Sequence, residues 1–275
     1  MSTPARSFDR TTADVPWPAA GEPPAADRAL AAHPPLYPVA LDLDGRLCLV
    51  VGGGVIARRK TVDLLAAGAR VRVVAPEWRS DFDELEAAYG ARIERRTGRF
   101  ETTDAAGVAL VIAATDDPVV QRAAWEAAAK YGLFCNVVDV THLCSFQVPA
   151  TVRRGALSVS VGTDGAFPLL AVALRDRIAR LVGEIFAPAV ERLAAARLRV
   201  RALHPSDAAA RARALRDLLS PETVDALLAG DADQFAARAA AWEARVEAAA
   251  SAAPTGRTGV AGSLPTGRAR AGGAP

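Results

Sequence analysis

Cysteine is scarce in this sequence, and its scarcity excludes two kinds of small scaffold. The 275 residues include only Cys48, Cys135 and Cys144, and no two of them form a Cys-x-x-Cys pair. An odd count without such a pair indicates neither a disulfide framework nor a structural zinc site, so we expect no metal ligands and a reducing, cytoplasmic location. Cys48 and Cys135 lie in apolar runs, where small buried side chains are expected.

Net charge and long apolar runs are lacking as well. The formal charge is +2, which gives no sign of the concentrated basic face of a nucleic-acid-binding protein. No apolar run is long enough to span a bilayer, and the N-terminus carries Arg6 and Arg10 without the apolar core of a secretory signal. We therefore expect no nucleic-acid partner and no membrane partner. Aromatic residues make up only 5% of the chain, which favours helices packed through small side chains.

The two ends of the chain have low complexity. Residues 1–35 are rich in Pro, Ala and Thr, and residues 251–275 are rich in Gly, Ala, Pro and Arg. Neither stretch shows a sustained hydrophobic period, so we predict a disordered extension and a disordered tail.

Between these ends, short apolar segments alternate with amphipathic ones as far as Val138. The pattern predicts strands over 46–51, 70–75, 92–95, 108–114 and 133–138, and helices over 55–67, 80–89 and 116–131. Apolar strands and amphipathic helices are what a parallel sheet covered on both faces requires. The predicted fold class is therefore α/β, a Rossmann-type doubly wound parallel sheet.

Beyond Val140 the pattern changes. It predicts two strands over 145–152 and 156–161, a long helix over 167–197, and two helices over 206–229 and 232–250. The second strand alternates between apolar residues and serine, which is typical of a strand with one packed face. We predict a small α+β region followed by C-terminal helices.

A glycine turn follows the first predicted strand. Gly52-Gly53-Gly54-Val55-Ile56-Ala57 matches the pattern Gly-x-Gly-x-x-Ala. Gly52 permits a tight turn, and Gly54 lets the backbone approach a pyrophosphate at the positive end of the next helix. Because the turn joins a strand to a helix and a second strand follows, a dinucleotide site is favoured over a turn without a ligand.

The end of the second strand reads Ala75-Pro76-Glu77. Rossmann domains often place an acid here to bind the ribose 2′-hydroxyl, and Glu77 is close enough to serve. The lack of an arginine directly after Ala75 favours NAD over NADP, although Arg79 keeps NADP open. A solvated loop charge is an equally good interpretation of Glu77 or Arg79.

The strand ending in Asn136-Val137-Val138-Asp139 brings a carboxylate to the ligand-binding edge of the sheet. Asp139 is suited to act as a general base or as an anchor for a metal ion, and a simple loop cap is equally compatible with its position. His142 is close enough in sequence to assist, although a lone histidine in a loop is more often simply exposed. Thr115 and Asp116 end the neighbouring strand, and Asp116 also fits a helix cap.

A second glycine-containing loop precedes the long predicted helix. Gly162-Thr163-Asp164-Gly165 is a possible anion site, and Arg153 and Arg154 flank the same region. Two adjacent arginines without further motif residues are more typical of a solvated hairpin tip than of an anion site.

These motifs together resemble a known family. They run in the order found in the precorrin-2 dehydrogenase family, which includes ferrochelatases acting on sirohydrochlorin and the N-terminal module of sirohaem synthase. The matching segments are 37–43, 50–54, 57–60, 64–69, 73–77, 113–117, 136–139, 146–150, 157–161 and 165–168. The resemblance covers roughly Tyr37 to Val200.

The resemblance implies a reaction, a cofactor and an assembly. It implies NAD-dependent oxidation of precorrin-2 to sirohydrochlorin, with ferrous iron (Fe2+) insertion to give sirohaem in some members, and a homodimer. It divides the matching part of the chain into an NAD-binding domain (36–144) and a dimerisation and substrate region (145–200). The helical C-terminal region (201–250) has no clear counterpart in the family.

The resemblance also implies roles for individual residues. Asp139 matches the essential aspartate of the family. The implied NAD contacts are Gly52, Gly54, Val55, Ile56, Pro76, Glu77 and Thr115, and the implied substrate contacts are Asn136, His142 and Thr163.

The chain departs from the family pattern in two loops. Val55 stands where an acid is common, and Thr163-Asp164-Gly165 stands where Ser-Gly-Gly or Thr-Gly-Gly is frequent. The acid at Asp164 weakens the case that this loop cradles substrate carboxylates. A non-catalytic NAD- or tetrapyrrole-binding sensor on the same scaffold is the alternative to the enzyme.

Overall fold

The computed structural model describes residues 35–252 of the chain. The predicted extension (1–35) and tail (251–275) lie outside these residues, except for residue 35 and residues 251–252. The last two are helical and end α8 (Ala232–Ala252). Contacts divide the chain into two compact units. The first holds the described residues up to Ala150 together with Val161–Leu174, and the second holds Thr151–Ser160 and the described residues from Arg175 onward.

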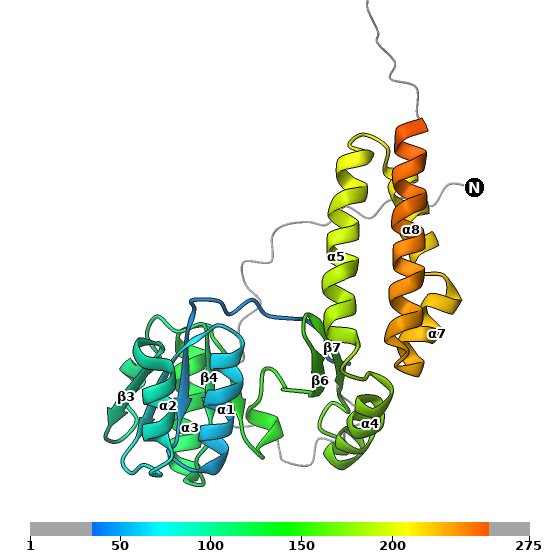
Figure 1. Ribbon diagram of the computed structural model, residues 1–275. Coiled ribbons are helices and arrows are strands. Elements are labelled where there is room, and N and C mark those ends of the chain that lie inside the picture. Colours follow the sequence, from blue (N-terminus) through cyan, green and yellow to red (C-terminus); the bar gives the residue numbers. More distant parts are fainter. Residues whose placement is uncertain (1–34, 253–275) are drawn as a thin grey trace, which may run out of the picture. The chain divides into compact units, whose positions relative to one another are not determined.

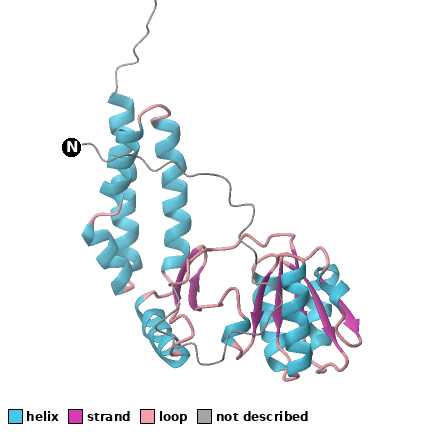
Figure 2. Cartoon of the chain, turned by 180° about the vertical axis from the view of Figure 1, so that it is seen from behind, coloured by secondary structure: helices cyan, strands magenta, loops and turns pink. Residues whose placement is uncertain are grey.

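The first unit is built on a five-stranded parallel sheet, seen from behind in Figure 2. Its order is β3-β2-β1-β4-β5, and the strands are β1 (Leu47–Val51), β2 (Arg70–Ala75), β3 (Ile93–Thr97), β4 (Leu110–Ala113) and β5 (Phe134–Val137). The chain winds outward from β1 in both directions, so the order reverses between β1 and β4. Ligands of such sheets bind beyond the carboxyl ends of the strands at this reversal.

Helices cover both faces of the sheet. They are α1 (Val55–Ala66), α2 (Phe82–Tyr89) and α3 (Pro118–Lys130), labelled in Figure 1. Val50 packs in one core cluster with Leu65 of α1 and Phe82 of α2, whereas Leu49 packs in a second cluster with Ala127 of α3. Alternate residues of β1 therefore face opposite helical layers, and the prediction of a doubly wound α/β fold is confirmed.

The second unit contains a two-stranded sheet and helices. Most of the hairpin that joins β6 (Ala150–Arg154) to β7 (Leu157–Val161) lies in this unit. The helices after it are α4 (Pro168–Leu181), of which only the residues from Arg175 onward belong to this unit, α5 (Phe186–Leu203), α6 (Ala208–Leu218), α7 (Pro221–Ala229) and α8. Helices α5 and α8 lie side by side in Figures 1 and 2 and are joined by an ion pair between Arg192 and Glu243. Buried Trp242 of α8 donates its indole N–H to the carbonyl oxygen of Ala214, 2.8 Å away.

Three predicted elements were wrong in their extent. The helix predicted over 167–197 is two helices, because the chain is not helical between Leu181 and Phe186, where Gly183 lies. The helix predicted over 206–229 is interrupted at Ser220, where Pro221 starts α7 and lacks the N–H that would continue α6. The strand predicted from residue 145 begins only at Ala150.

The cap of α3 is Asp117 rather than Asp116. The Asp117 carboxylate accepts hydrogen bonds from the backbone N–H groups of Val119 at 2.8 Å and Val120 at 3.4 Å, and Pro118 occupies the first turn. Asp117 therefore satisfies the free donors of the helix N-terminus. The carboxylate of Asp116 is left available to the crevice.

We expect Asp117→Ala to lower the free energy of unfolding by about 1 kcal/mol, because the helix loses its cap. Asp116→Ala is the matched control and should leave the free energy nearly unchanged. Urea denaturation of the two variants, followed by circular dichroism, measures both values. A larger loss in the Asp116 variant would show that the cap is assigned to the wrong residue.

Candidate active site

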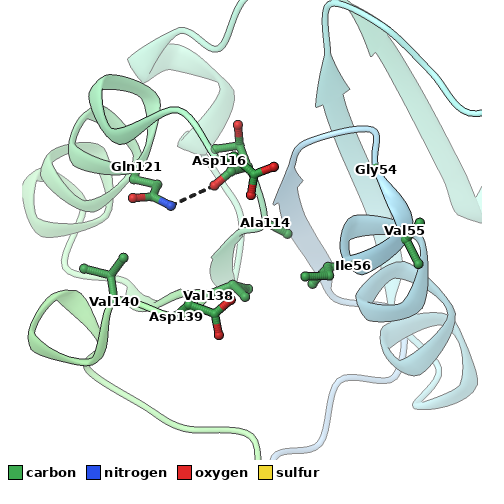
Figure 3. A pocket seen from close by; sticks show the side chains of 10 residues that line it. Gly54, Val55, Ile56, Ala114, Asp116, Gln121, Val138, Asp139 and Val140 are labelled. Atoms are coloured by element: carbon green, nitrogen blue, oxygen red, sulfur yellow. Dashed lines mark hydrogen bonds between the residues drawn. The ribbon is translucent and has the colours of Figure 1, made fainter.

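A pocket of about 300 Å³ lies beyond the carboxyl ends of the central strands (Figure 3). It is lined by Gly54, Val55, Ile56, Ala114, Thr115, Asp116, Gln121, Val138, Asp139 and Val140. These residues come from the glycine turn and α1, from the end of β4 and the start of α3, and from the loop after β5. Of the predicted site residues, the structure thus brings Gly54, Val55, Ile56, Thr115 and Asp139 together.

The first two glycines of the turn are required by packing. Gly52 has φ +128°, and a Cβ there would lie 2.1 Å from the carbonyl oxygen of Ala114. A Cβ at Gly53 would lie 2.1 Å from the carbonyl oxygen of Glu77. The turn is therefore pressed against the ends of both β4 and β2, and only glycine fits at these two positions.

The third glycine faces open space. A Cβ at Gly54 would meet no protein atom within 4 Å, and Gly54 precedes α1 without any side-chain cap. No acid lies in the first turn of α1, so the N–H groups there are free and the helix dipole presents its positive end. Free donors beside an open backbone fit the pyrophosphate of a dinucleotide.

The loop after β2 packs against the same turn. Pro76 and Glu77 are exposed and do not line the pocket of Figure 3, but the Glu77 carbonyl is the atom nearest to Gly53. The N–H of Arg79 donates to the carbonyl oxygen of Gly53 at 3.3 Å. The backbone of the loop that carries Glu77 is therefore held beside the glycine turn.

Asp139 has an unusual backbone conformation. Its φ is +62°, in the left-handed region that few residues other than glycine adopt, and its side chain is exposed at the pocket. Such conformations cost energy, are best tolerated by Asp and Asn, and concentrate at functional sites. The conformation persists because the neighbouring backbone is fixed: Val138 donates to Ala113 at 2.9 Å and Val140 donates to Val137 at 3.1 Å.

The thiol of Cys144 holds the loop that carries Asp139. Its Sγ lies 3.3 Å from the backbone nitrogen of Val137, 3.2 Å from the carbonyl oxygen of Val137 and 3.5 Å from the carbonyl oxygen of Val140. Burial raises the pKa of the Cys144 thiol, so it stays protonated and can donate. Sequence reasoning missed this role, because a cysteine outside any motif carries no signal of its contacts.

Asn136, in β5, also holds a neighbouring part of the backbone. Its amide donates to the carbonyl oxygen of Phe146 at 3.1 Å, and Asn136 is not among the pocket residues. The sequence analysis missed Gln121, whose amide donates to the carbonyl oxygen of Thr115 at 2.7 Å at the pocket edge (Figure 3). Its position in the sequence could have indicated this contact, because Gln121 lies in the first turns of α3, the helix that starts at the pocket.

His142 and Thr163 do not line the pocket, but the two segments that carry them lie close together. His142 belongs to the short 3₁₀ helix Thr141–Leu143. A Cβ at Gly165 would lie 3.0 Å from Cγ2 of Thr141, so the 162–165 loop packs beside this helix. The hydroxyl oxygen of Thr163 accepts a hydrogen bond from the N–H of Phe167 at 3.3 Å, just before α4.

Two features are absent from residues 35–252. No three or more His, Cys, Asp and Glu side chains in this part of the chain are grouped so that they could hold a metal ion. Within the same residues, no helix combines the length and apolar character needed to cross a membrane.

A parallel sheet with a glycine turn and an open helix N-terminus at its point of reversal defines a Rossmann domain for dinucleotides. Comparison with known proteins agrees, because residues 39–150 match a family model described as putative NAD(P)-binding. The match confirms the predicted nicotinamide dinucleotide cofactor.

Similar proteins narrow the class further. The chain is 41% identical over 212 residues to the sirohaem synthase of Methylococcus capsulatus, covering 76% of this chain and 44% of that protein. It is 48% identical over 137 residues to the sirohaem synthase of Ectopseudomonas mendocina, covering 50% of this chain and 29% of that protein. The chain thus spans less than half the length of these relatives.

A solved structure named SirC, precorrin-2 dehydrogenase, is similar over its whole length. The TM-score is 0.64 at 26% sequence identity, covering 78% of this chain and 100% of that one. These similarities support the resemblance to the precorrin-2 dehydrogenase family that the sequence motifs indicate.

Substitutions in the glycine turn should separate packing from ligand binding. We expect Gly54→Ala to keep the wild-type melting temperature but to weaken NADH binding at least about tenfold, because the new Cβ occupies the space of the pyrophosphate. Gly53→Ala should instead destabilise the fold, because its Cβ clashes with a backbone carbonyl.

Differential scanning calorimetry and NADH fluorescence titration measure the two effects. Equal NADH affinity of the Gly54 variant and the wild type would contradict a pyrophosphate position at this turn.

Proposed function

We propose that the chain oxidises precorrin-2 to sirohydrochlorin and uses NAD⁺ as the oxidant. The observation that carries this proposal is the pocket itself, where the open N-terminus of α1 and the Asp139 carboxylate line one cavity. The names of the similar proteins supply the substrate class and support the same assignment.

The reaction removes a hydride and a proton from the macrocycle. NAD⁺, when bound, accepts the hydride. Asp139 accepts the proton, since its exposed carboxylate is held by a fixed backbone at the pocket wall. A carboxylate at this position also stabilises positive charge that develops on the macrocycle as the hydride leaves.

Other residues bind and orient the two reactants. We assign the pyrophosphate to the backbone of Gly52, Gly54, Val55 and Ile56, the ribose to Pro76 and Glu77, and the nicotinamide end to Thr115. Glu77 at the end of β2 favours NAD over NADP.

For the substrate, we assign His142 and Thr163 to contacts with the macrocycle. The Thr163 loop packs beside the 3₁₀ helix that carries His142, which supports a shared role. Asn136 acts indirectly, because its amide holds the Phe146 carbonyl.

Asp139→Asn should lower the rate of NADH formation from precorrin-2 at least about 100-fold, because the proton acceptor is lost. Affinity for NADH should stay within about twofold, because the carboxylate is not a cofactor ligand. Asp63→Asn, on the exposed side of α1, is the matched control and should retain wild-type turnover.

Anaerobic incubation with precorrin-2 and NAD⁺, followed by ultraviolet-visible spectra, measures the rate. Wild-type protein that binds NADH yet forms no sirohydrochlorin would support the alternative function, a non-catalytic sensor.

The same carboxylate favours a second activity, the insertion of ferrous iron into sirohydrochlorin. Metal entry requires the loss of pyrrole protons, and Asp139 is placed to accept them. Ferrous iron added after the oxidation is complete should yield the sirohaem spectrum with wild-type protein and not with Asp139→Asn. Equal metal insertion by both proteins would rule out this role.

We further propose a homodimer in the cytoplasm, formed through α4. This helix exposes an unusual number of large apolar side chains: Leu169 is 73% exposed, and Leu170, Val172, Leu174 and Leu181 are exposed as well. The wild-type chain of 28.6 kDa should sediment at twice that mass.

Leu169→Glu should shift the protein to the monomer in sedimentation velocity, because a charge would be buried in the interface. Leu198→Glu is the control, because it makes the same substitution at a leucine of α5 that is 69% exposed. A monomeric wild type would contradict the proposal.

A further inference from the structure

Two arginines near the glycine turn are paired with a single aspartate. Asp81 accepts hydrogen bonds from Arg79, with Nη2 to Oδ2 at 3.1 Å and Nε to Oδ1 at 3.2 Å. From the other side, Nε of Arg58 lies 3.3 Å from Oδ2 of Asp81 and donates to its backbone carbonyl at 3.2 Å. One carboxylate thus engages both guanidinium groups.

The backbones of both arginines are tied to the glycine turn. Arg58 lies in the first turns of α1, and its N–H donates to the carbonyl oxygen of Gly54 at 3.0 Å. The N–H of Arg79 donates to the carbonyl oxygen of Gly53 at 3.3 Å. In Rossmann domains, the adenosine ribose lies at this point, between the turn and the end of the second strand. An arginine here accommodates the 2′-phosphate of NADP.

We infer that Asp81 sets the cofactor preference of this site, because it occupies Arg79 and Arg58 and so keeps them from the 2′-phosphate of NADP. The inference rests on the proposed dinucleotide site and adds to it a residue outside the predicted motif. Asp81 acts twice: it neutralises the two cations, and its own charge repels a phosphate. NAD, which has a hydroxyl in place of the phosphate, is not penalised in either way.

The burial and ionisation of the three side chains agree with this role. Their relative exposures are 27% for Asp81, 30% for Arg58 and 48% for Arg79, so a ligand can reach all three. The hydrogen bonds from Arg79 lower the pKa of Asp81, so its carboxylate is ionised at neutral pH. An NADP phosphate would have to displace this carboxylate before it could bind either arginine.

Replacing Asp81 should release Arg79, whereas Arg58 keeps a second ion pair with Glu84 at 3.6 Å. We expect Asp81→Asn to tighten NADPH binding about tenfold, equivalent to 1.4 kcal/mol, and to change NADH binding by less than about twofold. Fluorescence titration of each nucleotide with the full chain measures both dissociation constants. Adding Arg79→Ala to Asp81→Asn should remove most of the gain for NADPH, and the gain should shrink at high salt.

Asp83→Asn is the matched control. Asp83 lies two residues further on, in the first turn of α2, and pairs with Arg95 at 2.5 Å rather than with Arg58 or Arg79. The substitution changes the net charge equally and should leave the ratio of NADPH to NADH affinity unchanged. An equal shift in both variants, or no shift in Asp81→Asn, would overturn the inference.

Folding of the variants is controlled by a second substitution. Asp81 directly precedes α2, and Asp81→Ser removes the charge while keeping a residue suited to that position. The two Asp81 variants should therefore show the same gain in NADPH affinity at unchanged melting temperature. A gain in one and not in the other would also count against the inference.

The same titration separates this inference from the proposed function. A wild-type chain that binds neither nucleotide would contradict both. Nucleotide binding with the expected shift, but without oxidation of precorrin-2, would contradict the proposed reaction and leave the role of Asp81 standing.

Discussion

The close approach of the glycine turn to two other strand ends is the constraint on which this site depends. At Gly52 and Gly53, the turn after β1 lies against the carbonyl oxygens of Ala114 and Glu77, with no room for a Cβ at either position. Because the turn touches both neighbours, the ends of β4 and β2 and the start of α1 are fixed relative to one another. The cofactor residues proposed here lie on these segments.

A second group of contacts fixes the loop that carries Asp139. The loop after β5 is held by the thiol of Cys144 and by the Asn136 amide, and within it Asp139 takes a left-handed conformation. The energy stored in that conformation is offset by the surrounding hydrogen bonds. The backbone conformation thus sets the position of the Asp139 carboxylate at the pocket.

The sequence predicted most of the first unit correctly. The apolar strands, the amphipathic helices and the glycine turn follow local rules of periodicity and backbone freedom, so they could be recognised without tertiary contacts. The errors came where local patterns are ambiguous. Because the amphipathic pattern continues through Gly183, it did not indicate the break between α4 and α5. Asp116 and Asp117 are adjacent acids and either fits the cap position of α3, so the sequence could not show which of them caps the helix.

The sequence by itself determined the fold class, the family resemblance and the edge of the sheet at which the pocket lies. These depend on residue types in order along the chain, and such patterns can be read directly. Only the tertiary structure decided which side chains meet: Gln121 with Thr115, Cys144 with Val137, and Asp81 with both Arg58 and Arg79. The physical reason is that hydrogen bonds and ion pairs act over a few ångströms, so they depend on spatial neighbours that sequence spacing does not reveal.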